Sequence, residues 1–322
     1  MDFTPLLGQP FLGPAFPLPL DRPFTTAEAR YEAGLSYRDL KWLVDEGFLR
    51  HPVKGVYVAA QLGDSTSLRV QCLRLVVPED AVVCDRHAGW LHGAEMALAP
   101  NEHVNVMPIC VFLPPGRRLR NELTVGGERK LEPSDITEVD GLLVTTPIRT
   151  TWDLGRTRWT DRSIAGMDQM LRLGVFSKEE LIAGIERFRG MRWVTVLRVV
   201  APHTDGRAES PPESVLRLRW IETYLPAPIP QFEVWSAGEF LARLDLANEQ
   251  LRYAAEYDGA EWHSSPGQLE HDRLRRALVT EQEGWHITPF TKENLFGPHQ
   301  NADRVLRREI AEAGRRIRRT GA

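Results

Sequence analysis

Cysteine is scarce in this chain of 322 residues. The three cysteines, Cys72, Cys84 and Cys110, are widely spaced and form no C-x-x-C pair. This spacing argues against a zinc ribbon and against a disulfide scaffold. Unpaired cysteines are typical of a reducing compartment, so we expect the protein to be cytoplasmic.

Long hydrophobic runs are also missing. No uninterrupted apolar run approaches the roughly 20 residues that a transmembrane helix needs, so we expect no membrane partner. Residues 1–23 are apolar, but prolines interrupt them and no basic region precedes them, which is unlike a signal peptide. We predict that this proline-rich segment is an extended arm that packs on a domain surface.

The chain has no excess of positive charge. Lysine and arginine number 40 against 44 aspartates and glutamates, which gives a formal net charge of −4. Any nucleic-acid contact must therefore come from local basic patches. The length of the chain predicts two or three domains rather than one.

The segment after the arm predicts two short helices and a hairpin. Thr25 or Thr26 can cap the first helix, and Ser36 can cap the second, with Asp39 completing a capping box. The β-rich run FLRHPVKGVYVAA follows, with a turn at Lys54-Gly55. Helix, turn, helix and hairpin are the elements of a winged helix, whose second helix enters the major groove of DNA.

Basic side chains lie where a winged helix would contact DNA phosphates. We predict contacts from Arg38 and Lys41 on the second helix and from Arg50 and Lys54 on the wing. The alternative is a helix pair that contacts protein or simply faces solvent, because acidic residues share the second helix and would repel DNA: Asp39, Asp45 and Glu46.

The run RPFTTAEARYEAGLSYRDLKWLVDEGFLRHPVKGVYV resembles the N-terminal winged helix of AbiEi-type antitoxins and related actinobacterial regulators. The later runs DRHAGWLHG and TTPIRTTWDLGR resemble the domain that accompanies it, so the likeness covers about residues 22–190. The resemblance implies operator binding, autoregulation and, in some members, a nucleotidyltransferase toxin as the partner protein. A homodimer would suit the reading of an operator.

The middle segment carries polar residues that favour structural roles. His87 and His92 are five residues apart, which leaves them off one helix face and disfavours a metal site. We predict a buried helix start there, with Asp85 as its cap. Arg149 and Asp153 are four residues apart on a predicted helix, where they would form a structural ion pair.

The C-terminal segment brings carboxylates together. Ser210 can cap a helix that has Glu213 in its first turn. The runs FLARLDL and LRYAAEY predict two strands joined at residues 248–250. Along the second strand Glu256 and Asp258 share one face, because strand side chains alternate.

Such carboxylates could hold Mg²⁺ or Mn²⁺ for phosphodiester cleavage. Asp245, Glu256 and Glu213 are the candidate metal ligands, and His263 could transfer a proton. The strand register decides between two alternatives. A turn at Asn248-Glu249 would place Asp245 opposite Arg252 as an ion pair, whereas a turn centred near Gln250-Leu251 would place it opposite Glu256.

The run LDLANEQLRYAAEYDGAEWHS resembles the PD-(D/E)xK superfamily, near the very-short-patch-repair endonucleases. The resemblance implies that Asp245 is the central metal-binding aspartate, His263 the catalytic histidine and Glu213 the helix glutamate. It places Trp262 in a DNA-wedging segment and matches Asp272 and Arg275 to an aspartate-arginine pair, with Arg275 near DNA. Two features depart from the pattern: Asp258 stands where a lysine is expected, and no cysteine follows Cys110 to serve as a structural zinc ligand.

These observations predict an α/β (α+β) multidomain protein. We expect a proline-rich arm (1–23), a winged helix (24–60), an AbiEi-like α/β middle domain (61–206), a restriction-endonuclease-like domain (207–300) and a basic C-terminal helix (301–322). The predicted function is DNA binding with metal-dependent endonuclease activity, carried by Glu213, Asp245, Glu256, Asp258 and His263. The alternative is an antitoxin-like transcriptional regulator whose nuclease-like domain is catalytically silent.

Overall fold

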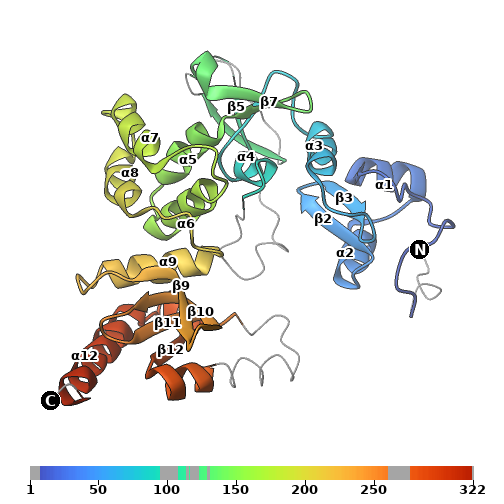
Figure 1. Cartoon of the computed structure of the whole chain (residues 1–322). Helices are drawn as coiled ribbons and strands as arrows, with labels where there is room; N and C mark the ends of the chain where they lie inside the picture. The colour runs from blue at the N-terminus through green and yellow to red at the C-terminus, as the bar shows by residue number, and fades with distance from the viewer. Residues whose placement is uncertain are drawn as a thin grey trace. The chain divides into compact units, whose positions relative to one another are not determined.

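The computed structural model describes residues 8–94, 108–113, 116, 123–128, 131–259 and 276–320. It is a mixed α/β structure with three sheets among the described residues. The chain divides into two compact units, residues 1–154 and 155–322, which run from blue to green and from green to red in Figure 1. None of the described helices is long and apolar enough to cross a membrane.

The first unit begins with the two predicted helices and the hairpin. Helix α1 (Thr26–Ala33) is capped by Thr25, and α2 (Tyr37–Asp45) is capped by Ser36. Strands β2 (Leu49–Val53) and β3 (Val56–Ala59) are antiparallel, and β1 (Phe24–Thr25) pairs with β3, which gives the order β1-β3-β2. The sequence predicted both capping residues correctly because a cap depends only on local hydrogen bonds.

The proline-rich arm packs on this segment. Leu12 and Leu18 are buried in one hydrophobic cluster with Phe24, Leu40 and Leu43. The side-chain amide of Gln61, two residues after β3, also donates a hydrogen bond to the carbonyl of Leu12 at 2.9 Å. The described part of the proline-rich segment therefore packs against the helix pair.

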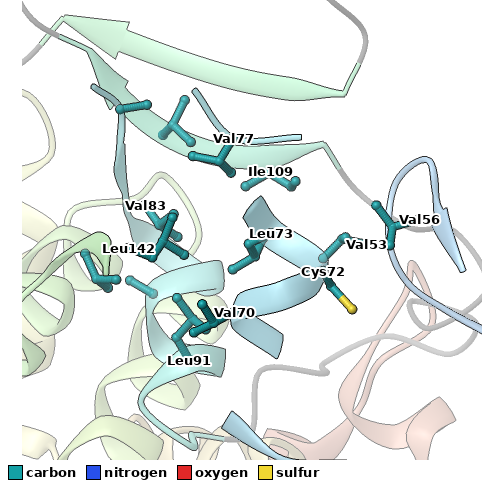
Figure 2. Close-up of a cluster of buried hydrophobic side chains, with 14 of the residues drawn as sticks. Val53, Val56, Val70, Cys72, Leu73, Val77, Val83, Leu91, Ile109 and Leu142 are labelled. Carbon is teal, nitrogen blue, oxygen red and sulfur yellow. The ribbon is translucent and has the colours of Figure 1, made fainter. Parts of the chain in front are cut away.

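The rest of the first unit is built on a five-stranded sheet of order β6-β5-β4-β8-β7. Its elements are α3 (Thr66–Arg74), β4 (Val82–Val83), α4 (Asp85–Leu91), β5 (Ile109–Leu113), β6 (Thr124–Glu128), a 3-10 turn (Pro133–Asp135), β7 (Ile136–Val139), β8 (Leu142–Thr145) and α5 (Pro147–Gly155). One buried cluster joins this sheet to the hairpin, since Val53 and Val56 share it with Leu73, Val83 and Ile109 (Figure 2). The hairpin and the sheet therefore stabilise each other.

The second unit combines helices with a four-stranded sheet of order β12-β11-β10-β9, in which only the β11–β12 pair is parallel. Its helices are α6 (Thr160–Leu171), α7 (Lys178–Ala183), α8 (Val194–Val200), α9 (Pro211–Ile221), α11 (Lys292–Leu295), α12 (Ala302–Thr320) and two 3-10 helices (Gly184–Phe188 and Ala201–His203). Its strands are β9 (Ile229–Ser236), β10 (Glu239–Asn248), β11 (Tyr253–Tyr257) and β12 (His286–Phe290). Residues 276–283 are also helical and lie between β11 and β12 in the chain.

Helix α6 packs against α9 through buried polar contacts. The Asp168 carboxylate on α6 lies 2.5 Å from Nη2 of Arg217 on α9, and both side chains are at most 5% exposed. Gln169 donates to the carbonyl of Ala208 at 3.2 Å, and Arg219 of α9 pairs with Asp161 at 2.6 Å. The domain boundary that the sequence suggested near residue 206 therefore lies inside one compact unit.

Candidate functional site

The exposed face of α2 is the first candidate surface. Asp39 accepts a hydrogen bond from the Ser36 backbone N–H at 2.7 Å, and Ser36 accepts one from the Asp39 N–H. The hydroxyl of Ser36, which also donates to Asp39, lowers the pKa of that carboxyl. Leu40 and Leu43 are fully buried. The capped helix is therefore held with one face in the core and its polar face in solvent.

Arg38 and Lys41 lie exposed on that polar face. Tyr37 beside them is 70% exposed. The Lys41 ammonium is 2.7 Å from the Asp45 carboxylate, and both side chains are about half exposed. An exposed pair of this kind contributes at most about 1 kcal/mol, so a phosphate can displace Asp45 at little cost.

The hairpin carries the other two predicted DNA contacts. The guanidinium of Arg50 donates to the carbonyl of Leu62 and is half-buried. Lys54 lies at the turn and is also half-buried. The Arg50 side chain is therefore engaged with the backbone carbonyl of Leu62. Lys54 is the cation of the hairpin that lies at the turn.

His51 shapes the same turn without carrying charge. Its ring stacks on Tyr57 with centroids 4.4 Å apart, and its Nε2 accepts a hydrogen bond from the Gly55 N–H at 3.1 Å. Burial lowers the pKa of His51 to about 4. The imidazole is therefore neutral at pH 7, where it fixes the turn that presents Lys54.

The histidines of the middle segment have structural roles, as predicted. His87 is 7% exposed and accepts a hydrogen bond from the Cys110 N–H at 3.1 Å, while His92 bonds a carbonyl at the end of β8 at 2.8 Å. Burial lowers the pKa of His87 to about 3. The predicted cap is wrong by one residue, because Cys84 is the N-cap and Asp85 is the first residue of α4.

Arg149 forms the predicted structural ion pair, and a second carboxylate joins it. Its Nε lies 2.8 Å from Asp153, and its Nη1 lies 2.6 Å from Asp135, with all three side chains at most 4% exposed. Burial opposes the charge, but the two carboxylates raise the pKa of Arg149. The group ties α5 to the turn before β7 and has no access to a substrate.

The carboxylates of β10 and β11 are the second candidate site. The observed register pairs Leu246 with Ala255 and Asn248 with Tyr253. Continued by one residue, it places Asp245 opposite Glu256, which is the second of the two registers that the sequence left open. The Asp245 carboxylate accepts a hydrogen bond from the Tyr257 N–H at 2.8 Å.

An arginine engages two of these carboxylates. The Nε of Arg276 lies 2.7 Å from Glu256, whose side chain is 3% exposed, and its Nη1 lies 3.4 Å from Asp258. Burial lowers the pKa of Arg276, but the hydrogen bond that Arg276 donates to Glu256 and the charges of both carboxylates outweigh it, so the pKa is raised. A cation therefore already balances the buried carboxylate that was predicted to bind a metal.

The third predicted ligand has a capping role. The Glu213 carboxylate accepts from the hydroxyl of Ser210 at 2.7 Å and from the Gln231 amide at 2.9 Å. Within the described ranges, no group of three or more histidine, cysteine or carboxylate side chains is arranged to hold a metal ion. The other predicted residues of this site, Trp262, His263, Asp272 and Arg275, lie outside the described residues.

Comparison with known proteins identifies part of the chain. Residues 81–201 match the model of the AbiEi antitoxin C-terminal domain. Two relatives, the uncharacterized proteins MT2308 and Rv2248 from two strains of Mycobacterium tuberculosis, are each 31% identical over 254 residues, which cover 79% of this chain and 89% of the relative. The chain belongs to the same family as these mycobacterial proteins.

The AbiEi match supports part of the first resemblance that the sequence predicted, namely the domain that follows the predicted winged helix. It begins just before β4 and ends in the 3-10 helix after α8. It therefore includes the buried histidines, the Arg149 ion pair and helix α6. The winged helix and the endonuclease likeness lie outside the matched residues, so both remain predictions.

Sequence reasoning missed the two arginines that bind buried carboxylates in the second unit. Arg276 lies 20 positions from Glu256, and Arg217 lies 49 positions from Asp168. No motif or helical spacing links residues so far apart. The only available signal was the apolar stretch around Arg217 in SVLRLRWI, because an arginine on a buried helix face needs an acidic partner.

Proposed function

We propose that this protein is an antitoxin-type transcriptional regulator that binds DNA through residues 24–60. The observation that carries the proposal is the match of residues 81–201 to the AbiEi antitoxin C-terminal domain. Before that match lie a capped helix pair and a hairpin, followed by α3. A helix that exposes basic side chains beside a hairpin is the arrangement that places a recognition helix in a major groove.

In this proposal Arg38 and Lys41 contact phosphates on either side of the groove, and Lys54 does so from the wing. Tyr37, exposed at the start of α2, is placed to reach a base edge. The DNA would be an operator upstream of the protein's own gene. The partner protein would be a toxin, and a dimer would read two half-sites.

The contacts of the carboxylates in the second unit favour a domain that does not cleave DNA. Arg276 pairs with Glu256 and Asp258, and Glu213 caps its own helix. A carboxylate that is already neutralised by an arginine is a poor ligand for a divalent ion, since the metal must displace the cation.

The test is binding of the full chain to its own upstream DNA and to a scrambled duplex of equal length. Arg38→Ala with Lys41→Ala should weaken binding to the upstream DNA by at least about tenfold, because each lost phosphate contact removes counterion release. The salt slope should fall by roughly one for each contact. Fluorescence anisotropy at several salt concentrations measures both.

The matched control removes two exposed arginines from the second unit, Arg162→Ala with Arg189→Ala. It changes the net charge equally and should leave the preference for upstream DNA intact. If the wild type bound both duplexes equally, the protein would have no preference for its upstream DNA. If the control weakened binding as much as the α2 variant, Arg38 and Lys41 would not be specific DNA contacts.

A second candidate is metal-dependent DNA cleavage at Asp245 and Glu256. The register that sets these carboxylates opposite each other favours it. Under this candidate the wild type nicks supercoiled plasmid with Mg²⁺ or Mn²⁺, with His263 moving the proton and Trp262 and Arg275 near the DNA. Asp245→Ala would abolish the nicking, and Arg162→Ala would retain it. Plasmid left intact by the wild type, with DNA still retained on the gel, removes the candidate.

A further inference from the structure

Helix α12 carries seven arginines and no lysine. Against them stand three carboxylates, Asp303, Glu309 and Glu312, so the helix is strongly basic in a chain whose net charge is −4. The helix packs against α9, β11 and β12 of the second unit. Figure 1 shows it in red at the C-terminal end of the chain.

The arginines gather on one face. With 3.6 residues per turn, six of them fall within an arc of about 120°: Arg304, Arg307, Arg308, Arg315, Arg318 and Arg319. All six are exposed. The opposite face is buried through Ala302, Leu306, Ile310 and Ala313, each at most 4% exposed. We call the six exposed residues the arginine stripe.

Neighbouring carboxylates neutralise only part of the stripe. Arg308 pairs with Glu309 at 2.7 Å, and Arg315 pairs with Glu312 at 2.6 Å. In the part of the chain that the structure describes, Arg304, Arg307, Arg318 and Arg319 make no ion pair. Four guanidinium groups along one face are therefore available to an external anion.

The stability of the helix does not explain this placement. Cations favour the last turn of a helix, where they offset the negative end of its dipole, but they are unfavourable in the first turn. Arg304 lies in the first turn of α12, which begins at Ala302. What fixes α12 to the unit is its apolar face and the 2.7 Å contact from Glu309 to His286, neither of which needs the stripe.

We propose that the arginine stripe of α12 binds the phosphate backbone of duplex DNA without regard to sequence. The stripe is about 22 Å long, since each helical residue rises about 1.5 Å. Its charge density of about one arginine per 4 Å is close to that of one DNA strand, which carries one phosphate per roughly 3.4 Å. Guanidinium groups suit this partner because they bind phosphate with two parallel hydrogen bonds.

This contact rests on the proposed function and extends it, because it would increase the affinity of the protein for any DNA site that the winged helix recognises. It does not depend on the choice of operator. Backbone contacts raise binding to every sequence equally, whereas base contacts raise binding only to the cognate one.

The experiment uses the full chain with Arg304→Ala, Arg307→Ala and Arg318→Ala combined, and with lysine at the same three positions. The alanine variant should lose at least about tenfold in affinity for both the upstream duplex and the scrambled duplex, and its salt slope should fall by about 2.7. The lysine variant should restore most of both. The control with Arg162→Ala, Arg189→Ala and Arg192→Ala removes the same charge from exposed positions of the same unit.

The outcomes separate this inference from the proposed function. Equal weakening on both duplexes, with an unchanged ratio between them, supports the stripe. Unchanged binding in the α12 variant, or equal weakening in the control, overturns it and leaves any preference for the upstream DNA untouched. The wild type could also bind both duplexes equally while the α12 variant binds both more weakly. That result overturns operator recognition and supports the arginine stripe. Absence of DNA binding by the wild type overturns both. Circular dichroism should show the same helix content in every variant.

Discussion

Buried polar side chains in this protein find their partners far away in the sequence. His87 accepts a hydrogen bond from the backbone N–H of Cys110, 23 positions later, and Arg149 pairs with Asp135, 14 positions earlier, as well as with Asp153. Each contact satisfies a group that would otherwise lose its hydrogen bonds to water on burial. Pattern reasoning recognised these residues as structural, but it could not name the partners of the histidines.

The neutral state of His87 should make the first unit sensitive to acid. Its pKa is about 3 in the folded chain, against an ordinary value of 6.5, so the unfolded chain binds the proton more tightly. Its contribution to stability is therefore complete above pH 6.5 and is lost as the pH falls, by about 1.4 kcal/mol per pH unit. His87→Gln should show a shallower fall in the urea midpoint between pH 7 and pH 5 than the wild type. Equal pH slopes for both proteins would contradict a buried neutral imidazole.

At the scale of elements, the junction between α6 and α9 holds the second unit together. Burial raises the pKa of Asp168 to about 6, although Arg217 opposes this, so the pair is ionised at pH 7. The Asp205 N–H donates to the same carboxylate at 2.8 Å. The polar run HTDGRAES (203–210), which precedes α9, is therefore part of the packed junction, despite a composition typical of a linker.

Gly206 tests how tightly this run is packed. A Cβ at this position would lie 2.9 Å from the backbone N of Arg172 and 3.0 Å from the carbonyl carbon of Leu171, which is too close for a backbone neighbour to yield. Gly206→Ala should therefore destabilise the protein by about 1–3 kcal/mol in urea unfolding. Gly63→Ala, where the Cβ would meet nothing within 4 Å, is the matched control. Equal midpoints for the two variants would show that the run is loosely held.

Elements whose signals are local were predictable from the sequence, and pairings between distant residues were not. Ser36 and Asp39 form the expected capping box, and the turn at Lys54-Gly55 separates the expected strands. The β10–β11 register stayed open because its connection is not a two-residue turn. There Asn248 accepts from the Leu251 N–H, and Arg252 adopts a φ of 48°, which a sequence pattern does not foretell for an arginine.

At the scale of the whole molecule, the AbiEi match extends across both compact units. Its residues up to 154 share a unit with the helix pair and the hairpin, and its residues from 155 to 201 share a unit with the C-terminal sheet. In the first unit, one cluster joins the hairpin to the five-stranded sheet. The predicted winged helix and the β part of the matched region therefore fold as one body.

The C-terminal sheet of the second unit has a structural role of its own. Helix α6 of the matched region places Asp168 against Arg217 of α9, and α9 in turn packs on the C-terminal sheet and on α12. Removing that sheet would expose the apolar faces of α9 and α12, and displacement of α9 would leave Asp168 buried without its cation, which is costly. The sheet therefore supports the packing of both helices, and this packing leaves the arginine stripe on the exposed face of α12.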